Sequence, residues 1–145
     1  MSYSLDANLL LYASDTSSPH FSSAKTFLEA IPRDPDLLCL TWITLLSYQR
    51  IATHPAIFRS PLAPAEAWAN VTALLTLPRV RLIGEDVSFA EDYAATAAAF
   101  PIRGNLVLDA HLATILREHG VRRLYTADAD FRKFEFLDVV NPLKA

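Results

Sequence analysis

The stretch YSLDANLLLY, residues 3–12, places a carboxylate directly after a short apolar segment. Residues 3–5 are predicted to form a buried strand, Asp6 follows it at once, and residues 9–12 are again apolar. A carboxylate in such surroundings is costly unless a positive partner, an Arg side chain or a metal ion, lies beside it. Asp6 is therefore the first candidate functional residue.

Outward from this stretch, short apolar segments alternate with amphipathic helices. Further strands are predicted at residues 37–40, 80–83, 123–126 and 139–140. Helices are predicted at residues 18–31 with Pro19 in the first position, at 42–54 capped by Thr41, from residue 64 to before Pro78, at 88–100, and at 106–119 capped by Asn105. This alternation is typical of an α/β fold with a mainly parallel sheet.

Composition limits the class of protein. The chain has 145 residues, of which 52% are hydrophobic and 20% charged, so we expect a single domain over residues 1–145 with a real core that includes Trp42 and Trp68. The one cysteine, Cys39, excludes intrachain disulfides and Cys-based metal sites. No apolar run reaches the ~18–20 residues of a membrane span, and the N-terminus lacks a signal-peptide pattern. We therefore expect a cytoplasmic protein without membrane contact.

Three acids occupy positions where α/β proteins bind ligands. Asp6 ends the first predicted strand, Asp128 follows the fourth, and Asp109 lies in the first turn of the helix before that strand. Ligands of open α/β sheets bind beyond the carboxyl ends of the strands. Ordinary structural roles also remain open: Asp109 could favour the helix dipole, and Asp128 and Asp130 could be turn or cap residues. If the acids bind a metal, the lack of a Cys or His cluster favours Mg²⁺ or Mn²⁺ over Zn²⁺.

Together these motifs resemble those of PIN domains. The likeness is carried by SLDANLLLY (residues 4–12), LDAHLA with EHG (108–113 and 118–120), and LYTADADF (124–131). The segment RIATHPAIF (50–58) is similar to a stretch found in one branch of VapC-type toxins. The resemblance covers essentially the whole chain. It implies a three-layer α/β/α domain with a mainly parallel sheet of about five strands in the order 3-2-1-4-5.

The resemblance also implies an activity. It is that of a Mg²⁺-dependent endoribonuclease, with Mn²⁺ able to substitute, which acts as the toxin of a type II toxin–antitoxin pair. The expected assembly is a homodimer bound by a small VapB-like antitoxin, which would provide the only contact with DNA. RNA is the expected substrate, and its contacts are expected from Arg50, Asn8 and Thr126.

The acids take specific roles under this resemblance. Asp6, Asp109 and Asp128 are the expected catalytic residues and, with Asp130, the expected metal ligands. One position departs from the family pattern: many PIN domains carry a Glu three residues before the Arg, where this chain has Ser47 before Arg50, and residues 37–59 contain no acid. We expect Ser47 to face the metal site.

Two alternatives stay open, and the missing Glu supports only the first of them. One is a weak or inactive PIN-like module that binds RNA or its antitoxin without cutting. The other is a metal-dependent nuclease or phosphatase that acts on a different substrate.

Overall fold

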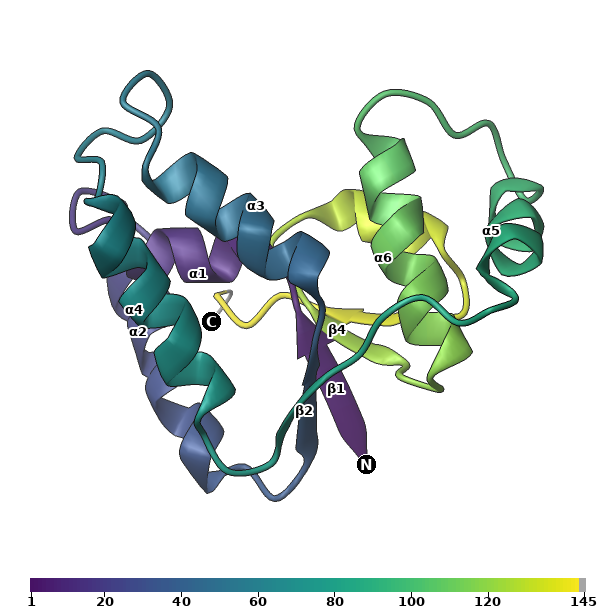
Figure 1. The fold of residues 1–145 in the computed structure, drawn as a ribbon, viewed down its shortest axis with the longest axis horizontal. Helices are drawn as coiled ribbons and strands as arrows, with labels where there is room; N and C mark the ends of the chain where they lie inside the picture. Colours follow the sequence, from purple (N-terminus) through teal and green to yellow (C-terminus); the bar gives the residue numbers. More distant parts are fainter. Residues whose placement is uncertain (144–145) are drawn as a thin grey trace.

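A five-stranded parallel sheet forms the centre of the protein, seen in a computed structural model that describes residues 1–143 (Figure 1). The strands are β1 (Ser2–Leu5), β2 (Leu37–Leu40), β3 (Val80–Leu82), β4 (Arg123–Tyr125) and β5 (Asp138–Val140). Their order is β3-β2-β1-β4-β5, and each neighbouring pair is parallel. The predicted α/β class and strand order are confirmed. Because Leu5 pairs with Tyr125, β1 and β4 end side by side.

Helices cover both faces of the sheet, which gives three layers (Figure 1). One layer contains α1 (Ala7–Ala13), α2 (Phe21–Ala30), α3 (Trp42–Ala52) and α4 (Pro64–Leu75). The other contains α5 (Phe89–Ala97) and α6 (Leu106–Glu118). The chain also contains two short 3₁₀ helices, η1 (Ile31–Arg33) after α2 and η2 (Ala129–Lys133) after β4.

The alternation of side chains along the strands builds two cores. In β2, Leu38 and Leu40 join the core under α1, α3 and α4, whereas Cys39 points to the opposite core with α6. Successive strand residues face opposite sides of a sheet, so a strand that is apolar throughout fits only between two helical layers. This explains why the predicted strands carry continuous apolar runs.

The structure adds one helix, α1, to those predicted, and Asp6 is its N-cap residue. The predicted start of the next helix at Ser18 is wrong, because α2 begins at Phe21. The Ser18 hydroxyl oxygen accepts a hydrogen bond from the backbone N–H of His20 at 3.1 Å and closes a turn before the helix. Other predicted ends agree with the observed ones to within three residues.

Of the two predicted caps, one is confirmed. The Thr41 hydroxyl oxygen accepts from the backbone N–H of Thr44 at 3.3 Å, as an N-cap side chain does. Asn105 occupies the N-cap position of α6, but its side chain makes no capping bond, so that prediction is wrong. Backbone carbonyls already accept from the first N–H groups of α6, which leaves nothing for the side chain to cap.

The expected burial of Trp42 and Trp68 is also wrong. Each is 42% exposed, and their rings stack with centroids 6.2 Å apart and planes 10° from parallel. Trp42 begins α3 and Trp68 lies on α4, so the ring pair joins these two helices at the surface of the protein. None of the helices within residues 1–143 is both long and apolar enough to span a membrane.

Candidate functional site

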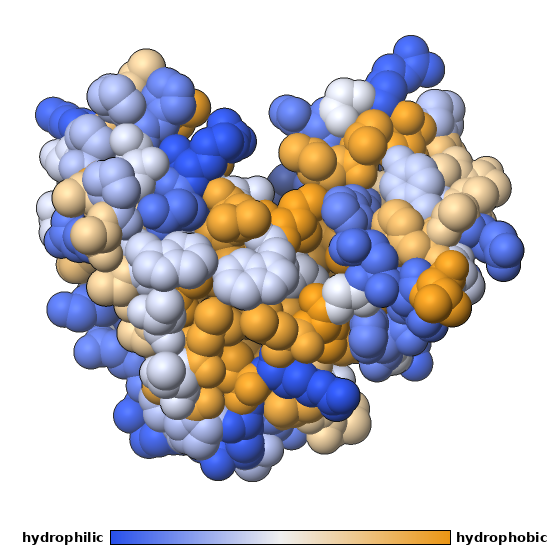
Figure 2. Space-filling view, in the orientation of Figure 1, coloured by the Kyte–Doolittle hydropathy of each residue, from blue (hydrophilic) through white to orange (hydrophobic). Residues whose placement is uncertain are grey.

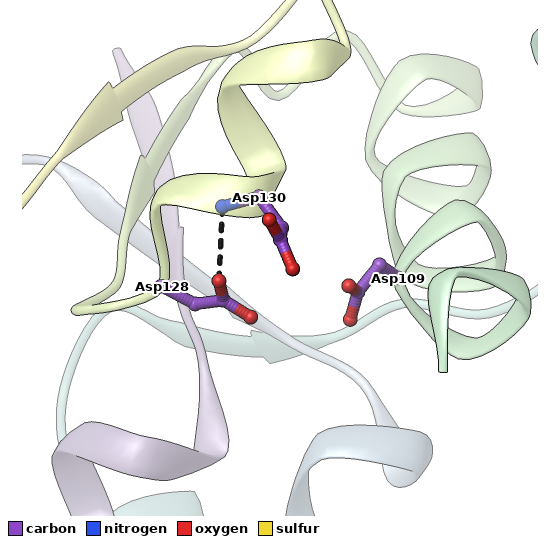
Figure 3. Close-up of side chains that lie close together, drawn as sticks. All are labelled: Asp109, Asp128 and Asp130. Atoms are coloured by element: carbon purple, nitrogen blue, oxygen red, sulfur yellow. Dashed lines mark hydrogen bonds between the residues drawn. The ribbon is translucent and has the colours of Figure 1, made fainter. Parts of the chain in front are cut away.

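Three carboxylates meet beyond the carboxyl edge of the sheet (Figure 3). Asp109 comes from the first turn of α6, whereas Asp128 and Asp130 come from the turn that leads from β4 into η2. One oxygen of each side chain lies within 4.8 Å of the others. The cluster therefore joins residues almost twenty positions apart in the chain through the packing of α6 beside the end of β4.

Local backbone geometry orients the side chains of Asp128 and Asp130. The Asp128 side chain caps η2, where its Oδ1 accepts from the backbone N–H of Asp130 at 2.9 Å (Figure 3). This Asx turn holds the Asp128 carboxylate beside that of Asp130. The turn interpretation of these acids is thus correct, and the same turn places both carboxylates toward Asp109.

Asp6 lies next to this cluster but outside the group of three. Its Oδ1 accepts from the backbone N–H of Ala7 at 2.8 Å, and its Oδ2 accepts from the Thr126 hydroxyl at 3.0 Å. Asp6 and Asp109 line the same cavity. Asp6 therefore both caps α1 and presents its carboxylate to the site.

The Thr126 hydroxyl connects β1, β4 and the acidic turn. It donates to Asp6, and it accepts from the Asn8 side-chain amide at 3.1 Å and from the backbone N–H of Asp128 at 3.0 Å. Thr126 is only 1% exposed. Because this hydroxyl is buried and has three hydrogen-bond partners, its role is to orient Asp6. This role differs from the contact with RNA that was expected of Thr126. Asn8 lines the cavity, and its amide also approaches Asp6 at 3.4 Å.

Electrostatics at the site oppose full ionisation of the acids. Burial, together with the charges of Asp128, Asp6 and Asp130, raises the pKa of Asp109 from 3.8 to about 7. Burial also raises the pKa of Asp6, against hydrogen bonds from Thr126 and Ala7 that lower it. Within residues 1–143, no Lys, Arg or His forms an ion pair with any of these four acids. In the described part of the chain, the carboxylates are thus held together without a cationic side chain paired to them.

A cavity of about 300 Å³ opens between α3 and α6 next to the acids. Figure 2 shows the molecule hollowed between these two helices, with apolar side chains along the hollow. Its lining residues are Asp6, Ala7, Asn8, Leu11, Ile43, Thr44, Ser47, Arg50, Ile51, Asn105, Leu108, Asp109, Leu112 and Phe131. Arg50 is the one cationic side chain among them, so a phosphate entering the cavity would meet a single guanidinium opposite the acids.

Both α3 residues singled out in the sequence face the cavity, whereas His54, two residues beyond the end of α3, does not. Ser47 lines the cavity, which confirms its predicted orientation, and Arg50 lies one turn further along the same helix. His54 turns toward the following loop, where its Nδ1 accepts from the backbone N–H of Ala56 at 3.1 Å. Asn105 also lines the cavity and was not predicted to do so, although its spacing of four from Asp109 is the signal for a shared helix face.

The donor set fits a hard divalent cation. Asp109, Asp128 and Asp130 offer only oxygen atoms, and they form the one group within residues 1–143 whose geometry suits a shared ion. Carboxylate oxygens are preferred by Mg²⁺ and Mn²⁺, and a cation would offset the carboxylate repulsion that adds to burial in raising the pKa of Asp109. The fold and the site thus define an α/β protein with an acidic centre at the edge of a parallel sheet.

Comparisons with known proteins agree with this description. A family model described as "PIN domain" matches residues 3–137. Ribonuclease VapC48 of Mycobacterium tuberculosis is 39% identical over 142 residues, which cover 98% of each chain. Ribonuclease VapC37 of the same species is 34% identical over 131 residues, 90% of each chain. The chain belongs to the PIN-domain family, among proteins of the VapC type.

Solved structures share the fold at lower identity. The VapBC2 complex of Rickettsia felis, solved with a DNA fragment from its promoter, contains a chain with a TM-score of 0.70 and 19% identity. The similarity covers 97% of this chain and 98% of that one. At such identity the likeness concerns the fold, and it extends over nearly every element described above.

Proposed function

We propose that this protein is a divalent-metal-dependent endoribonuclease and the toxin of a toxin–antitoxin pair. The observation that carries the proposal is the cluster of Asp109, Asp128 and Asp130, which has no ion-paired cation among residues 1–143, in a chain 39% identical to a protein named a ribonuclease. Mg²⁺ is the proposed ion, and Mn²⁺ is expected to replace it. The proposed unit is a single domain over residues 1–145 that acts in the cytoplasm.

Each acid has a proposed role. Asp109 and Asp130 hold the cation, and Asp6, the residue after β1, adds a further ligand. When bound, the cation supplies positive charge for the phosphodiester in the transition state and lowers the pKa of a nearby water. Without the cation, the Asp109 carboxyl is only partly ionised near neutral pH, because burial and the neighbouring carboxylates raise its pKa to about 7. Asp128 either holds the cation or orients the attacking water.

The remaining residues hold the substrate and the acids in place. Arg50 donates to phosphate oxygens from the α3 side of the cavity, where its guanidinium fork suits a phosphate. Thr126 and Asn8 act behind the site by fixing the Asp6 carboxylate through hydrogen bonds of 3.0 and 3.4 Å. Single-stranded or looped RNA is the proposed substrate, since cleavage needs a backbone that is accessible to the acids.

The proposed partners follow from the relatives. The chain of Rickettsia felis with the same fold was solved as a VapBC complex on promoter DNA. We infer a small VapB-like antitoxin that covers the acidic cavity of a homodimer, with DNA reached only through the antitoxin. An acidic cavity in a protein of net charge −3 favours a cationic segment of that antitoxin.

The test is a cleavage assay with purified protein. Single-stranded RNA, single-stranded DNA and a small phosphate ester are incubated with Mg²⁺, with Mn²⁺ and with chelator, using Asp109→Asn beside the native protein. The proposal requires cleavage of RNA that needs metal and is lost in the variant. Binding of RNA without cleavage would instead identify the PIN-like binding module, and cleavage of DNA or the ester alone would identify the other alternative.

A further inference from the structure

Asn105 lies on the α6 wall of the acidic cavity, one helical turn before Asp109. We propose that Asn105 is a substrate-binding residue whose side-chain amide hydrogen-bonds a ribose 2′-hydroxyl of the RNA next to the cleaved bond. The inference rests on the proposed function and deepens it, because it assigns the preference for RNA over DNA to one side chain.

The capping role that would otherwise explain Asn105 is absent. An Asn at this position normally has an extended backbone and accepts from the N–H groups of the first turn. Here the backbone of Asn105 is helical, with φ −62° and ψ −23°. The N–H of Leu106 donates to Arg103 O at 3.3 Å, and that of Val107 donates to Gly104 O at 3.0 Å.

The residue before Asn105 explains this geometry. Gly104 has a φ of +62°, a conformation that glycine adopts at little cost. The turn at Gly104 lets the chain enter α6 with its first N–H groups already bonded to backbone carbonyls, including Leu108 N–H to Asn105 O at 3.1 Å. The amide of Asn105 is consequently free of any local backbone task.

The Asn105 side chain has no structural role in the described part of the chain. It is exposed, and within residues 1–143 it makes no hydrogen bond to another side chain. A spacing of four residues puts Asn105 and Asp109 on the same face of α6, about 6 Å apart along the helix axis. The amide therefore flanks the carboxylates on the cavity wall instead of joining them.

The chemistry of an amide matches a hydroxyl better than a phosphate. A phosphate oxygen only accepts hydrogen bonds, and Arg50 already offers a cationic donor to it from the opposite wall. A 2′-hydroxyl both donates and accepts, as does the amide of Asn105. The amide is also neutral, so it adds no charge that would repel the RNA backbone beside the acids. The 2′-hydroxyl is the group by which proteins distinguish RNA from DNA.

The experiment compares Asn105→Ala with the native protein on one RNA oligonucleotide that the native protein cleaves. A matched set of oligonucleotides carries a single 2′-deoxy position on either side of the cleaved bond. Val107→Ala is the control, because Val107 lies in the same turn, is 42% exposed and does not line the cavity. The readouts are kcat and KM for each pair, RNA affinity by fluorescence anisotropy, and the melting temperature.

One hydrogen bond predicts a loss of about 3- to 10-fold. Asn105→Ala should raise KM and the RNA dissociation constant by this factor, with kcat, melting temperature and Mn²⁺ affinity unchanged. One of the deoxy oligonucleotides should bind the native protein more weakly by the same factor. That oligonucleotide and the all-ribose RNA should bind Asn105→Ala with equal affinity. Val107→Ala should behave like the native protein.

Three results would overturn the inference. The first is an unchanged KM in Asn105→Ala. The second is that, at every deoxy position, the loss of affinity from the deoxy change adds to the loss from Asn105→Ala. The third is a fall in melting temperature that accompanies the loss of activity. Failure of the proposed function gives a different result, namely no RNA cleavage by the native protein. In that case the anisotropy series still tests whether Asn105 contacts a 2′-hydroxyl.

Discussion

Replacing Asp109 by Asn should stabilise the metal-free protein, and the gain should depend on pH. The folded-state pKa of Asp109 is about 7 against an ordinary 3.8, so the unfolded chain releases this proton at lower pH than the folded chain does. Folding therefore opposes ionisation of Asp109, and stability is lost as pH rises from about 4 to 7. Asn at this position carries no charge and avoids that loss.

The magnitude follows from the size of the pKa shift. A full shift of this size corresponds to roughly 4 kcal/mol above pH 7. Asp109 is only half buried and solvent screens its neighbours, so we expect about 1–2 kcal/mol in practice. For a chain of this length that is a difference in melting temperature of roughly 3–6 °C. Asp109→Asn should match the native protein near pH 4 and exceed it by this amount near pH 8.

Metal should reverse the order of the two proteins. A ligand at a hundred times its dissociation constant stabilises by about 2.7 kcal/mol, and the native protein should gain such stability from Mn²⁺. Asp109→Asn lacks one of the three clustered carboxylates and should gain much less. The variant is thus expected to melt higher in chelator and lower in Mn²⁺.

The assay is thermal melting from pH 4 to 8, in chelator and in millimolar Mn²⁺. Glu91→Gln is the control, because it removes an exposed carboxylate of α5 that has no ion pair within residues 1–143. Its difference from the native protein should stay flat with pH. A flat difference for Asp109→Asn as well, or equal stabilisation of both proteins by Mn²⁺, would refute the reasoning.

Further predictions concern residues around the same site. Asp6→Asn should reduce RNA cleavage at least tenfold, about 1.4 kcal/mol of transition-state stabilisation, without unfolding the protein in a circular-dichroism melt. Ser47→Glu should tighten Mn²⁺ binding by calorimetry yet lower the melting temperature in chelator, because it adds a carboxylate to the cavity. Thr126→Val should cost about 1–3 kcal/mol in urea unfolding, since it removes the buried hydroxyl that bonds Asp6. Antitoxin association, followed by stopped flow, should slow as salt rises, and a rate independent of salt would argue against a cationic segment at the acids.

The order of elements and the positions of two acids were determined by the sequence alone. Apolar runs of strand length, helical periodicity and the Thr41 cap are local signals, and local signals report backbone conformation directly. Asp6 and Asp128 could be placed at the carboxyl ends of strands for the same reason. The resemblance to PIN domains then supplied the strand order, which the paired ends of β1 and β4 bear out.

Predictions from local sequence were wrong where the same residues can adopt two different local arrangements. The helix expected from Ser18 starts later, because the Ser18 side chain closes a turn of its own. Trp42 and Trp68 stack on each other at the surface, each 42% exposed, although large apolar residues are the usual occupants of a core. The start of α2 and the exposure of the two Trp side chains depend on neighbouring residues as well as on residue type.

Distances through space were decided only by the tertiary structure. Asp130 rather than Asp6 joins Asp109 and Asp128 within 4.8 Å, because the η2 turn brings it there when α6 packs beside β4. Thr126 proved to be a buried hub behind Asp6, and Asn105 a free amide on the cavity wall. Sequence spacing predicts which residues are neighbours on one helix or strand. Contacts between elements depend on how the helices pack on the sheet, and this packing is a property of the whole core.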